Sequence, residues 1–245
     1  MNYAIKADGV YKTFLVDRYH ATLYRIFKRK LLGRSLRPKT ITALNDINFE
    51  IHEGENVAIV GNNGSGKTTL LKVIAGLYRP NKGCLSVNGK ITVLSGLGLG
   101  MYDELSVEEN MYLYGMIYGL RREIIRKNFH EIIEWAELQN FTGAKFKTLS
   151  SGMKARLAFS VTRHMESDIL LFDEALSAGD KDFRDKCNAV FKDYINKGVT
   201  LIVATHNTTF VKNFCQKTLW LRKGHQMAFE KTEEVLPKYL DVKNS

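Results

Sequence analysis

The chain has 245 residues and a hydrophobic fraction of 44%, which suits one large α/β domain or two small ones. It has no apolar run long enough to span a membrane and no apolar signal-peptide core near its N-terminus. The net charge of +10 predicts an anionic partner: a nucleotide, a nucleic acid or the acidic inner leaflet of a membrane. Cys84, Cys187 and Cys215 are widely spaced and odd in number, so we expect buried reduced thiols and a cytosolic location.

The first part of the chain combines an alternating strand with a basic segment. Residues 3–14 alternate in polarity and predict an opening strand. Residues 17–39 are rich in arginine and lysine, with Asp17 as the only acid, and their apolar side chains recur at three- and four-residue steps. This pattern favours a basic amphipathic helix. The pattern alone leaves open whether such a helix lies on a membrane surface or a partner, or packs as a solvated helix on the domain.

A glycine-rich loop follows two predicted strands, Thr42–Ile51 and Asn56–Val60. Gly61–Thr68 fits G-x-x-x-x-G-K-[ST] and stands between a buried strand and a helix start, as a phosphate-binding loop requires. Its backbone N–H groups and the helix dipole would bind phosphate oxygens. Lys67 would reach the outer phosphates, and the Thr68 hydroxyl would hold Mg²⁺. The expected nucleotide-binding residues are Gly61, Asn62, Asn63, Gly64, Ser65, Gly66, Lys67, Thr68 and Thr69.

The middle of the chain changes from strands to helices. Two short strands are predicted near Cys84–Val87 and Ile91–Leu94, and a flexible glycine–leucine loop follows over residues 95–100. Residues 107–140 are helical in pattern, with one apolar face over residues 123–137, and another helix is predicted over residues 150–164.

The opening of that last helix is a candidate second anion site. Ser150, Ser151, Gly152 and Met153 combine small residues with the free N–H groups of a helix N-terminus. One chain does not need two phosphate sites for one nucleotide, whereas two chains arranged head-to-tail would use both. The alternative is an ordinary serine N-cap, which the segment in isolation favours.

Two buried, parallel strands in the second half carry polar residues at their ends. Asp173 ends the strand near residues 169–173, where its carboxylate can hold Mg²⁺, and the following Glu174 can polarise a water for attack on a γ-phosphate. His206 ends the strand over residues 199–206, at the carboxyl edge where open α/β sheets bind ligands. Asn207 is a predicted N-cap for the next helix. A hairpin with Lys223-Gly224 in its turn is predicted after that helix, and the C-terminal tail is predicted to be helical.

Taken together and in this order, the motifs resemble those of an ABC transporter nucleotide-binding subunit. Gly61–Thr68 matches that family's Walker A loop, Leu149–Met153 its signature motif and Ile169–Asp173 its Walker B strand. The resemblance implies that Glu174 is the catalytic glutamate and His206 the switch histidine.

Two further positions follow from the resemblance. Ser177–Asp180 matches the D-loop, so Asp180 is expected at the nucleotide. Phe14 falls where the family usually stacks an aromatic ring on adenine, and Tyr11 is the nearby alternative.

The resemblance also implies a fold. We expect an α/β P-loop NTPase with a RecA-like core of mostly parallel sheet, an antiparallel β subdomain and an inserted helical subdomain. Residues 1–245 would form a single ATPase domain. Residues 1–95 and 165–245 would make the core with the β subdomain and the basic insertion 17–39, and residues 96–164 the helical subdomain with the signature motif.

Departures from the family pattern narrow the resemblance. The signature is usually L-S-G-G-Q and here is Leu-Ser-Ser-Gly-Met. The family's Q-loop glutamine is missing, and Gly96 or Leu97 occupies that region. No residue of this chain is therefore assigned to the roles of that glutamine. With the glycine–leucine loop and the basic insertion, these features resemble the ATPases of polysaccharide exporters for O-antigen, capsule or teichoic acid, in the shorter type without a C-terminal carbohydrate-binding domain.

The expected function is therefore ATP hydrolysis, with Mg²⁺, that powers export of a lipid-linked polysaccharide. Two copies would form a homodimer on two transmembrane permease subunits, peripheral to the cytoplasmic face of the bacterial inner membrane, with the polysaccharide near the permease entrance and no nucleic acid bound. The alternative is a soluble ABC-type ATPase that acts on nucleic acid or ribosomes, as the positive charge permits. Two features of the sequence argue against this alternative: the chain carries one ATPase core, and it has no long coiled-coil insertion.

Overall fold

The computed structural model describes residues 2–16, 39–94, 100–173 and 181–244. Four earlier predictions fall outside these ranges: the basic amphipathic helix, most of the glycine–leucine loop, Glu174, and the Ser177–Asp180 segment.

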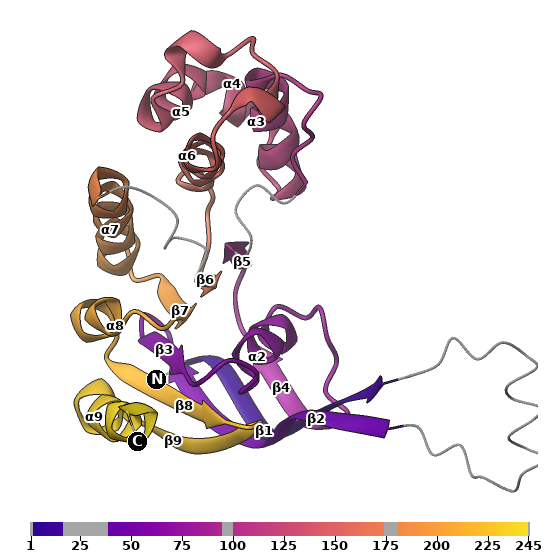
Figure 1. Cartoon of the computed structure of the whole chain (residues 1–245), viewed down its shortest axis with the longest axis vertical. Coiled ribbons are helices and arrows are strands. Elements are labelled where there is room, and N and C mark those ends of the chain that lie inside the picture. The colour runs from indigo at the N-terminus through magenta and orange to yellow at the C-terminus, as the bar shows by residue number, and fades with distance from the viewer. Residues whose placement is uncertain (1, 17–38, 95–99, 174–180, 245) are drawn as a thin grey trace, which may run out of the picture.

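The described residues build one nine-stranded sheet in the order β4-β1-β2-β9-β8-β3-β7-β6-β5 (Figure 1). The strands β8, β3, β7, β6 and β5 run parallel to one another, whereas β1 pairs antiparallel with β2 and β4, and β8 pairs antiparallel with β9. This confirms the predicted parallel core with an antiparallel β part. The strands are β1 Tyr3–Val16, β2 Lys39–His52, β3 Asn56–Val60, β4 Lys82–Val87, β5 Ile91–Leu94, β6 Ile169–Asp173, β7 Thr200–Ala204, β8 Lys217–Arg222 and β9 His225–Lys231.

Helices cover both faces of the parallel strands (Figure 1). On one face, α2 (Lys67–Ile74) packs its buried leucines and isoleucine against a core that includes Leu44 and Ile59. On the other face, α7 (Lys181–Asn196), α8 (Thr208–Phe214) and α9 (Thr232–Asn244) cover a core that includes Ala58 and Phe172. Neighbouring residues of β3 thus serve opposite cores, as the alternation of a strand requires.

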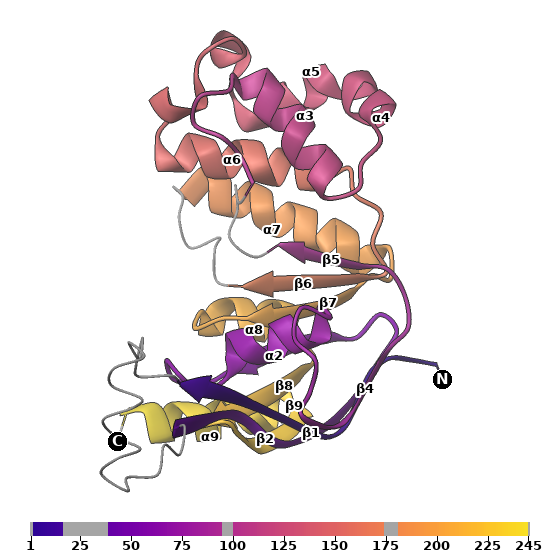
Figure 2. The same cartoon turned by 90° about the vertical axis from the view of Figure 1, so that its right-hand side faces the viewer.

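A separate group of helices carries a third core and lies beyond the β5 edge of the sheet (Figure 2). It comprises α3 Val107–Ile117, α4 Arg122–Lys127, α5 Phe129–Ala136 and α6 Ser151–Thr162, with short 3₁₀ turns at Gln139–Phe141 and Phe146–Thr148. Trp135 stacks on Phe159 and meets Phe183 of α7 edge-on, so aromatic contacts join this helical subdomain to the rest. Within the ranges that the structure describes, no helix is both long and apolar enough to cross a bilayer.

The helical pattern predicted over residues 107–140 is divided in the structure. Gly119, with a φ of 85°, follows α3, a conformation that residues other than glycine seldom adopt. Asn128 separates α4 from α5, and its side-chain amide donates to the Ile124 carbonyl at 2.8 Å. The predicted apolar face survives this division, because Ile125 and Ile132 both lie in the third core.

The cysteine prediction is wrong for one residue. Cys187 and Cys215 are buried, and burial raises the pKa of each thiol to about 12. Cys84 is exposed, because it lies on β4, an edge strand of the sheet, whose side chains are half-buried at most.

Candidate nucleotide-binding site

Three adjacent parallel strands bring the predicted site residues to one edge of the sheet. In the order β3-β7-β6, Ile59 pairs with Ala204, and Ala204 pairs with Asp173. The chain leaves β3 at Gly61 and β7 just before His206, so both segments emerge beside Asp173 at the carboxyl edge.

The phosphate loop packs closely against the backbone of two strands, β2 and β8. Gly66 has a φ of 110°, and a Cβ there would lie 2.6 Å from the Ala43 carbonyl oxygen of β2. Gly61 has a φ of 152°, and a Cβ there would lie 2.3 Å from the Leu221 carbonyl oxygen of β8. Glycine is therefore required at both positions. Sequence reasoning did not identify Ala43 or Leu221, because main-chain carbonyls leave no side-chain signal.

Lys67 connects the loop to His206, which lies two residues after the end of β7 and not at the end of the strand as predicted. The side chain is buried, and its Nζ donates to the Gly61 carbonyl at 2.7 Å and to the Asn62 carbonyl at 3.2 Å. The same Nζ lies 3.2 Å from His206 Nε2. The structure thus brings together the lysine and histidine that the sequence places at two separate motifs.

Thr68 and Asp173 form a second contact at this edge. The Thr68 hydroxyl donates to Asp173 Oδ2 at 3.2 Å. A hydroxyl and a carboxylate are the oxygen ligands that Mg²⁺ prefers, so these two residues fit the metal predicted from the sequence.

The remaining loop residues differ in exposure. Asn62, Asn63 and Gly64 are exposed at the mouth of the loop, and Thr69 is half-buried in the first turn of α2. Ser65 is buried, and its Oγ has no hydrogen-bond partner within the described part of the chain. An unsatisfied buried hydroxyl in this loop fits a site that an anionic ligand completes.

The segment Leu149–Met153 lies in the helical subdomain, not beside the loop. Ser150 is the N-cap of α6, and its Oγ accepts from the Met153 N–H at 3.3 Å. Ser150 and Ser151 are exposed, and Gly152 and Met153 are half-buried. Figures 1 and 2 place the start of α6 in the helical subdomain, whereas α2 lies against the sheet. The predicted serine cap is thus present in the structure.

Exposed ion pairs surround that segment. Asp103 pairs with Lys154 at 2.9 Å, and Glu104 pairs with Lys147 at 2.8 Å and Lys145 at 2.9 Å. Hydrogen bonds from Lys147 and then Lys145 lower the pKa of the Glu104 carboxyl. These pairs tie the loop before α3 to the stretch that leads into α6.

Phe14 lies on β1, where its ring meets Tyr78 edge-on at 5.4 Å between centroids. Tyr11 is half-buried, and its backbone pairs with Lys82 of β4. Both rings are within the described chain. Glu174 and Asp180, the other predicted site residues, lie outside it.

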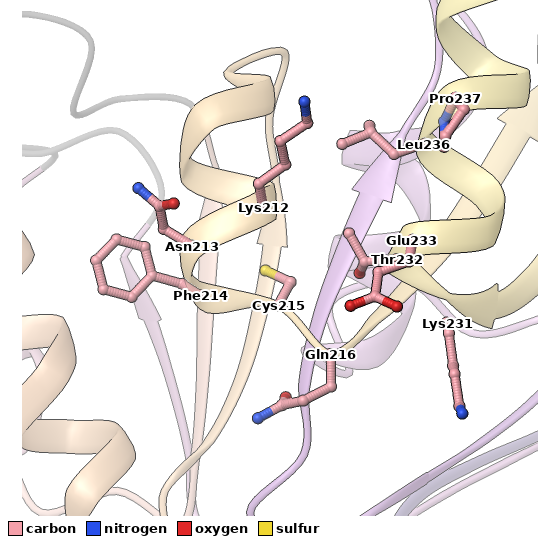
Figure 3. A pocket seen from close by; sticks show the side chains of 10 residues that line it. All are labelled: Lys212, Asn213, Phe214, Cys215, Gln216, Lys231, Thr232, Glu233, Leu236 and Pro237. Atoms are coloured by element: carbon pink, nitrogen blue, oxygen red, sulfur yellow. The ribbon is translucent and has the colours of Figure 1, made fainter.

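A groove of about 790 Å³ lies elsewhere, between the end of α8 and the start of α9 (Figure 3). Phe214, Cys215 and Leu236 form its apolar part, and Lys212, Lys231 and Glu233 are exposed around it. It adjoins Gln216, which precedes β8, so it is at the opposite edge of the sheet from the phosphate loop.

Comparison with known proteins gives a consistent family. Residues 44–177 match the ABC transporter family. The chain is 41% identical over 226 residues to an O-antigen export system ATP-binding protein of Myxococcus xanthus, covering 89% of this chain and 52% of that protein. It is 38% identical over 239 residues to a teichoic acids export ATP-binding protein of Bacillus anthracis, covering 98% and 43%. The chain thus spans about half the length of these two relatives.

Other relatives agree in length and fold. An O-antigen export system ATP-binding protein of Klebsiella pneumoniae is 35% identical over 214 residues, which cover 87% of each chain. A dimeric ATP-binding cassette in a post-hydrolysis state, bound to ADP and Pi, superimposes with a TM-score of 0.73 at 25% identity, covering 93% of this chain and 98% of that one. An ATP-binding subunit of an ABC transporter shares the fold at a TM-score of 0.73, with 20% identity over 96% of this chain and 93% of that one.

Proposed function

The chain belongs to the ABC transporter family, and we propose that it binds and hydrolyses ATP to power the export of a lipid-linked polysaccharide through a separate permease. One observation carries the ATPase part of the proposal. Lys67, Thr68, Asp173 and His206 come from three separate segments and meet at one edge of the sheet. Those are the groups that bind a polyphosphate, hold Mg²⁺ and respond to the terminal phosphate.

Binding starts at the loop and the N-terminus of α2. The Lys67 ammonium, which contacts the Gly61 and Asn62 carbonyls, exchanges these for phosphate oxygens. Thr68 and Asp173 hold Mg²⁺, which when bound neutralises charge on the β- and γ-phosphates. The Thr68–Asp173 contact keeps both ligands together before binding.

Hydrolysis then needs an activated water. In this proposal the Glu174 carboxylate accepts the proton of a water whose oxygen attacks the γ-phosphorus, while the bond from that phosphorus to the ADP oxygen breaks. His206, adjacent to Lys67, contacts the γ-phosphate and registers its release.

A second copy completes the site. Ser150–Met153 of one chain would cover the nucleotide held on the phosphate loop of the other, with Asp180 at the shared interface. ATP binding closes this homodimer, and hydrolysis reopens it. The dimeric cassette among the structural relatives supports such an assembly.

The export part of the proposal rests on the names of the relatives. Proteins 35% to 41% identical to this chain are named for O-antigen and teichoic acid export. We place this chain at the cytoplasmic face of the bacterial inner membrane, as a peripheral homodimer bound to two permease subunits. The basic segment 17–39 would face the anionic membrane and the polysaccharide near the permease entrance.

Substitution of the proposed base tests hydrolysis. Glu174→Gln keeps the size of the side chain but removes the proton acceptor, so ATP turnover should fall by at least ~100-fold. Size-exclusion chromatography should then detect an ATP-bound dimer that persists. Undiminished phosphate release by the purified variant would remove Glu174 from this role.

Charge reversal in the basic segment tests the membrane assignment. Replacing Arg25, Lys28 and Arg29 with glutamate should leave the ATPase rate of the purified chain unchanged and stop export in cells. Unchanged export would refute the assignment. If the unsubstituted chain binds RNA or DNA with an affinity that falls as the salt concentration rises, the result would instead favour the alternative of a soluble ATPase that acts on nucleic acid.

A further inference from the structure

Phe14 lies within a short distance of the phosphate loop along the β1–β2 ribbon. In the register of the two strands, Phe14 pairs with Ile41, and Thr13 pairs with Thr42. The next residue of β2 is Ala43, whose carbonyl oxygen abuts Gly66. At about 3.3 Å per residue, Phe14 is thus only a few residues of strand from the loop.

Two side chains hold the Phe14 ring. Tyr78 meets it edge-on, with 5.4 Å between centroids and 71° between planes. Lys12 Nζ lies 5.2 Å from the Phe14 ring centroid and 5.4 Å from that of Tyr78, so one cation faces both rings. Such contacts are attractive because the faces of aromatic rings carry negative potential.

The backbone around this cluster is also tied down. Lys12 Nζ donates to the Arg79 carbonyl at 2.8 Å, which fixes the ammonium. The Thr13 N–H donates to Asn81 Oδ1 at 2.8 Å, and the Asn81 N–H donates to the Tyr11 carbonyl at 2.8 Å. The chain that follows α2 is therefore fastened to β1 on both sides of Lys12.

The same chain segment is anchored to α2. The Tyr78 N–H donates to the Lys72 carbonyl at 3.1 Å, and Lys72 Nζ lies 5.5 Å from the Tyr78 ring centroid. Because α2 begins at the phosphate loop, Tyr78 connects the position of the Phe14 ring to the element that binds the phosphates.

We propose that Tyr78 and Lys12 are positioning residues that hold the half-buried Phe14 ring as a platform for the purine base. This rests on the proposed ATPase function and assigns residues that no sequence motif indicates. The edge contact of Tyr78 and the ammonium of Lys12 restrict the ring, so it does not lose rotational freedom when the base stacks on its remaining surface. The Tyr11 carbonyl accepts one of the hydrogen bonds that hold this cluster in place, and Phe14 is the ring that the cluster orients.

Two ligands separate base recognition from phosphate recognition. Equilibrium affinities of the full chain would be measured for ATP and for inorganic tripolyphosphate, which lacks a base. Phe14→Ala should weaken ATP binding about 5- to 100-fold, the range for loss of a stacked base. Tyr78→Ala should weaken it about 3- to 10-fold through loss of the aromatic pair. Tripolyphosphate affinity should stay unchanged in both variants.

A double variant shows whether Tyr78 acts through Phe14. Once Phe14 is alanine, Tyr78→Ala should have no additional effect on the affinity for ATP, because the ring that it orients is gone. Tyr78→Phe retains the edge contact and should bind ATP as the parent chain does. Lys12→Met keeps the stem but removes the charge, and should weaken ATP binding about 2- to 5-fold. Leu77→Ala, an exposed neighbour, is the matched control and should change neither affinity.

Several results would overturn the inference while leaving the ATPase proposal intact. They are an unchanged ATP affinity in Tyr78→Ala, an equal loss for ATP and tripolyphosphate, or additive losses in the double variant. Failure of the parent chain to bind either ligand would instead refute the proposed function itself.

Discussion

The phosphate loop and the segment Leu149–Met153 both lead into helices, but the structure holds them in different ways. The loop packs closely against the backbones of β2 and β8, and its lysine and threonine contact a residue that follows β7 and one that ends β6. In the segment, Ser150 Oγ accepts one weak hydrogen bond from the Met153 N–H at 3.3 Å, and exposed ion pairs lie around it. The loop belongs to the sheet, whereas the segment belongs to a subdomain with its own core.

This difference indicates how the work of the site is divided. Close backbone packing preorganises the phosphate loop within one chain, so its geometry is part of the fold. The exposed N-terminus of α6 is positioned by the helical subdomain as a body, through the aromatic contacts of Trp135 with Phe159 and Phe183. An exposed segment of that kind is suited to contact a nucleotide that is bound by another copy of the chain.

The largest expected effect comes from disabling each region in a different chain. Lys67→Ala removes the phosphate ligand, and Gly152→Asp places a carboxylate where a phosphate would approach; each should lower ATP hydrolysis about 10²–10³-fold. Gly152 has room for a side chain, and an acid in the first turn of a helix is compatible with folding.

Mixing these two variants then decides whether the regions act together across chains. A mixed dimer contains one site with an intact loop and an intact segment, so the mixture should regain activity that neither variant has alone. Lys192→Ala, an exposed change on α7, is the control and should retain full activity. A mixture as inactive as its components would contradict the shared site.

An intermediate effect is expected from the cap of α6. Ser150→Ala should lower the free energy of unfolding by about 1 kcal/mol or less, because it removes one N-cap hydrogen bond. It should also slow ATP hydrolysis if the segment contacts nucleotide. The matched control is Ser106→Ala, which removes the N-cap of α3 and its reciprocal contact with Glu109.

Urea unfolding and phosphate release would be measured for both cap variants. Ser106→Ala should reduce stability and leave ATP hydrolysis unchanged. Equal losses of activity in the two variants would show that Ser150 acts through folding alone.

The smallest expected effect concerns Glu137, which connects the helix that carries the segment, α6, to α7. This residue ends α5 and pairs with Arg156 of α6 and Lys186 of α7. The hydrogen bond from Lys186 lowers the pKa of its carboxyl. A depressed folded pKa contributes stability that is present at neutral pH and lost as the pH falls through that value.

We therefore expect Glu137→Gln to be less stable than the parent chain at pH 7, by a modest amount because the carboxylate is half exposed. The difference should become smaller at about pH 3, because the parent carboxylate takes up a proton as the pH falls through its lowered pKa. Chemical unfolding at both pH values measures it, and Glu134→Gln on the exposed face of α5 is the control. A stability difference that stays as large at low pH would assign Glu137 a role other than this charge pairing.

Local patterns predicted much of the fold because they depend on neighbouring residues. The buried run before Gly61 is strand β3, Asn207 caps α8 by accepting from the Phe210 N–H at 3.1 Å, and Lys223-Gly224 forms the turn of the β8–β9 hairpin. Each of these predictions depends on only a few residues that are adjacent in the sequence. The division of residues 107–140 into separate helices was missed, because a side-chain bond such as that of Asn128 competes with an otherwise helical pattern.

The sequence by itself determined the parts: a phosphate loop between strand and helix, a carboxylate and a histidine after buried strands, and a capped helix that carries Ser150. Only the tertiary structure decided which parts meet. Lys67 and His206 are 139 residues apart, and Thr68 and Asp173 are 105 residues apart. They meet because the parallel order β3-β7-β6 brings their strand ends to one edge. That order depends on how the apolar faces pack between helices, which no single stretch of sequence specifies.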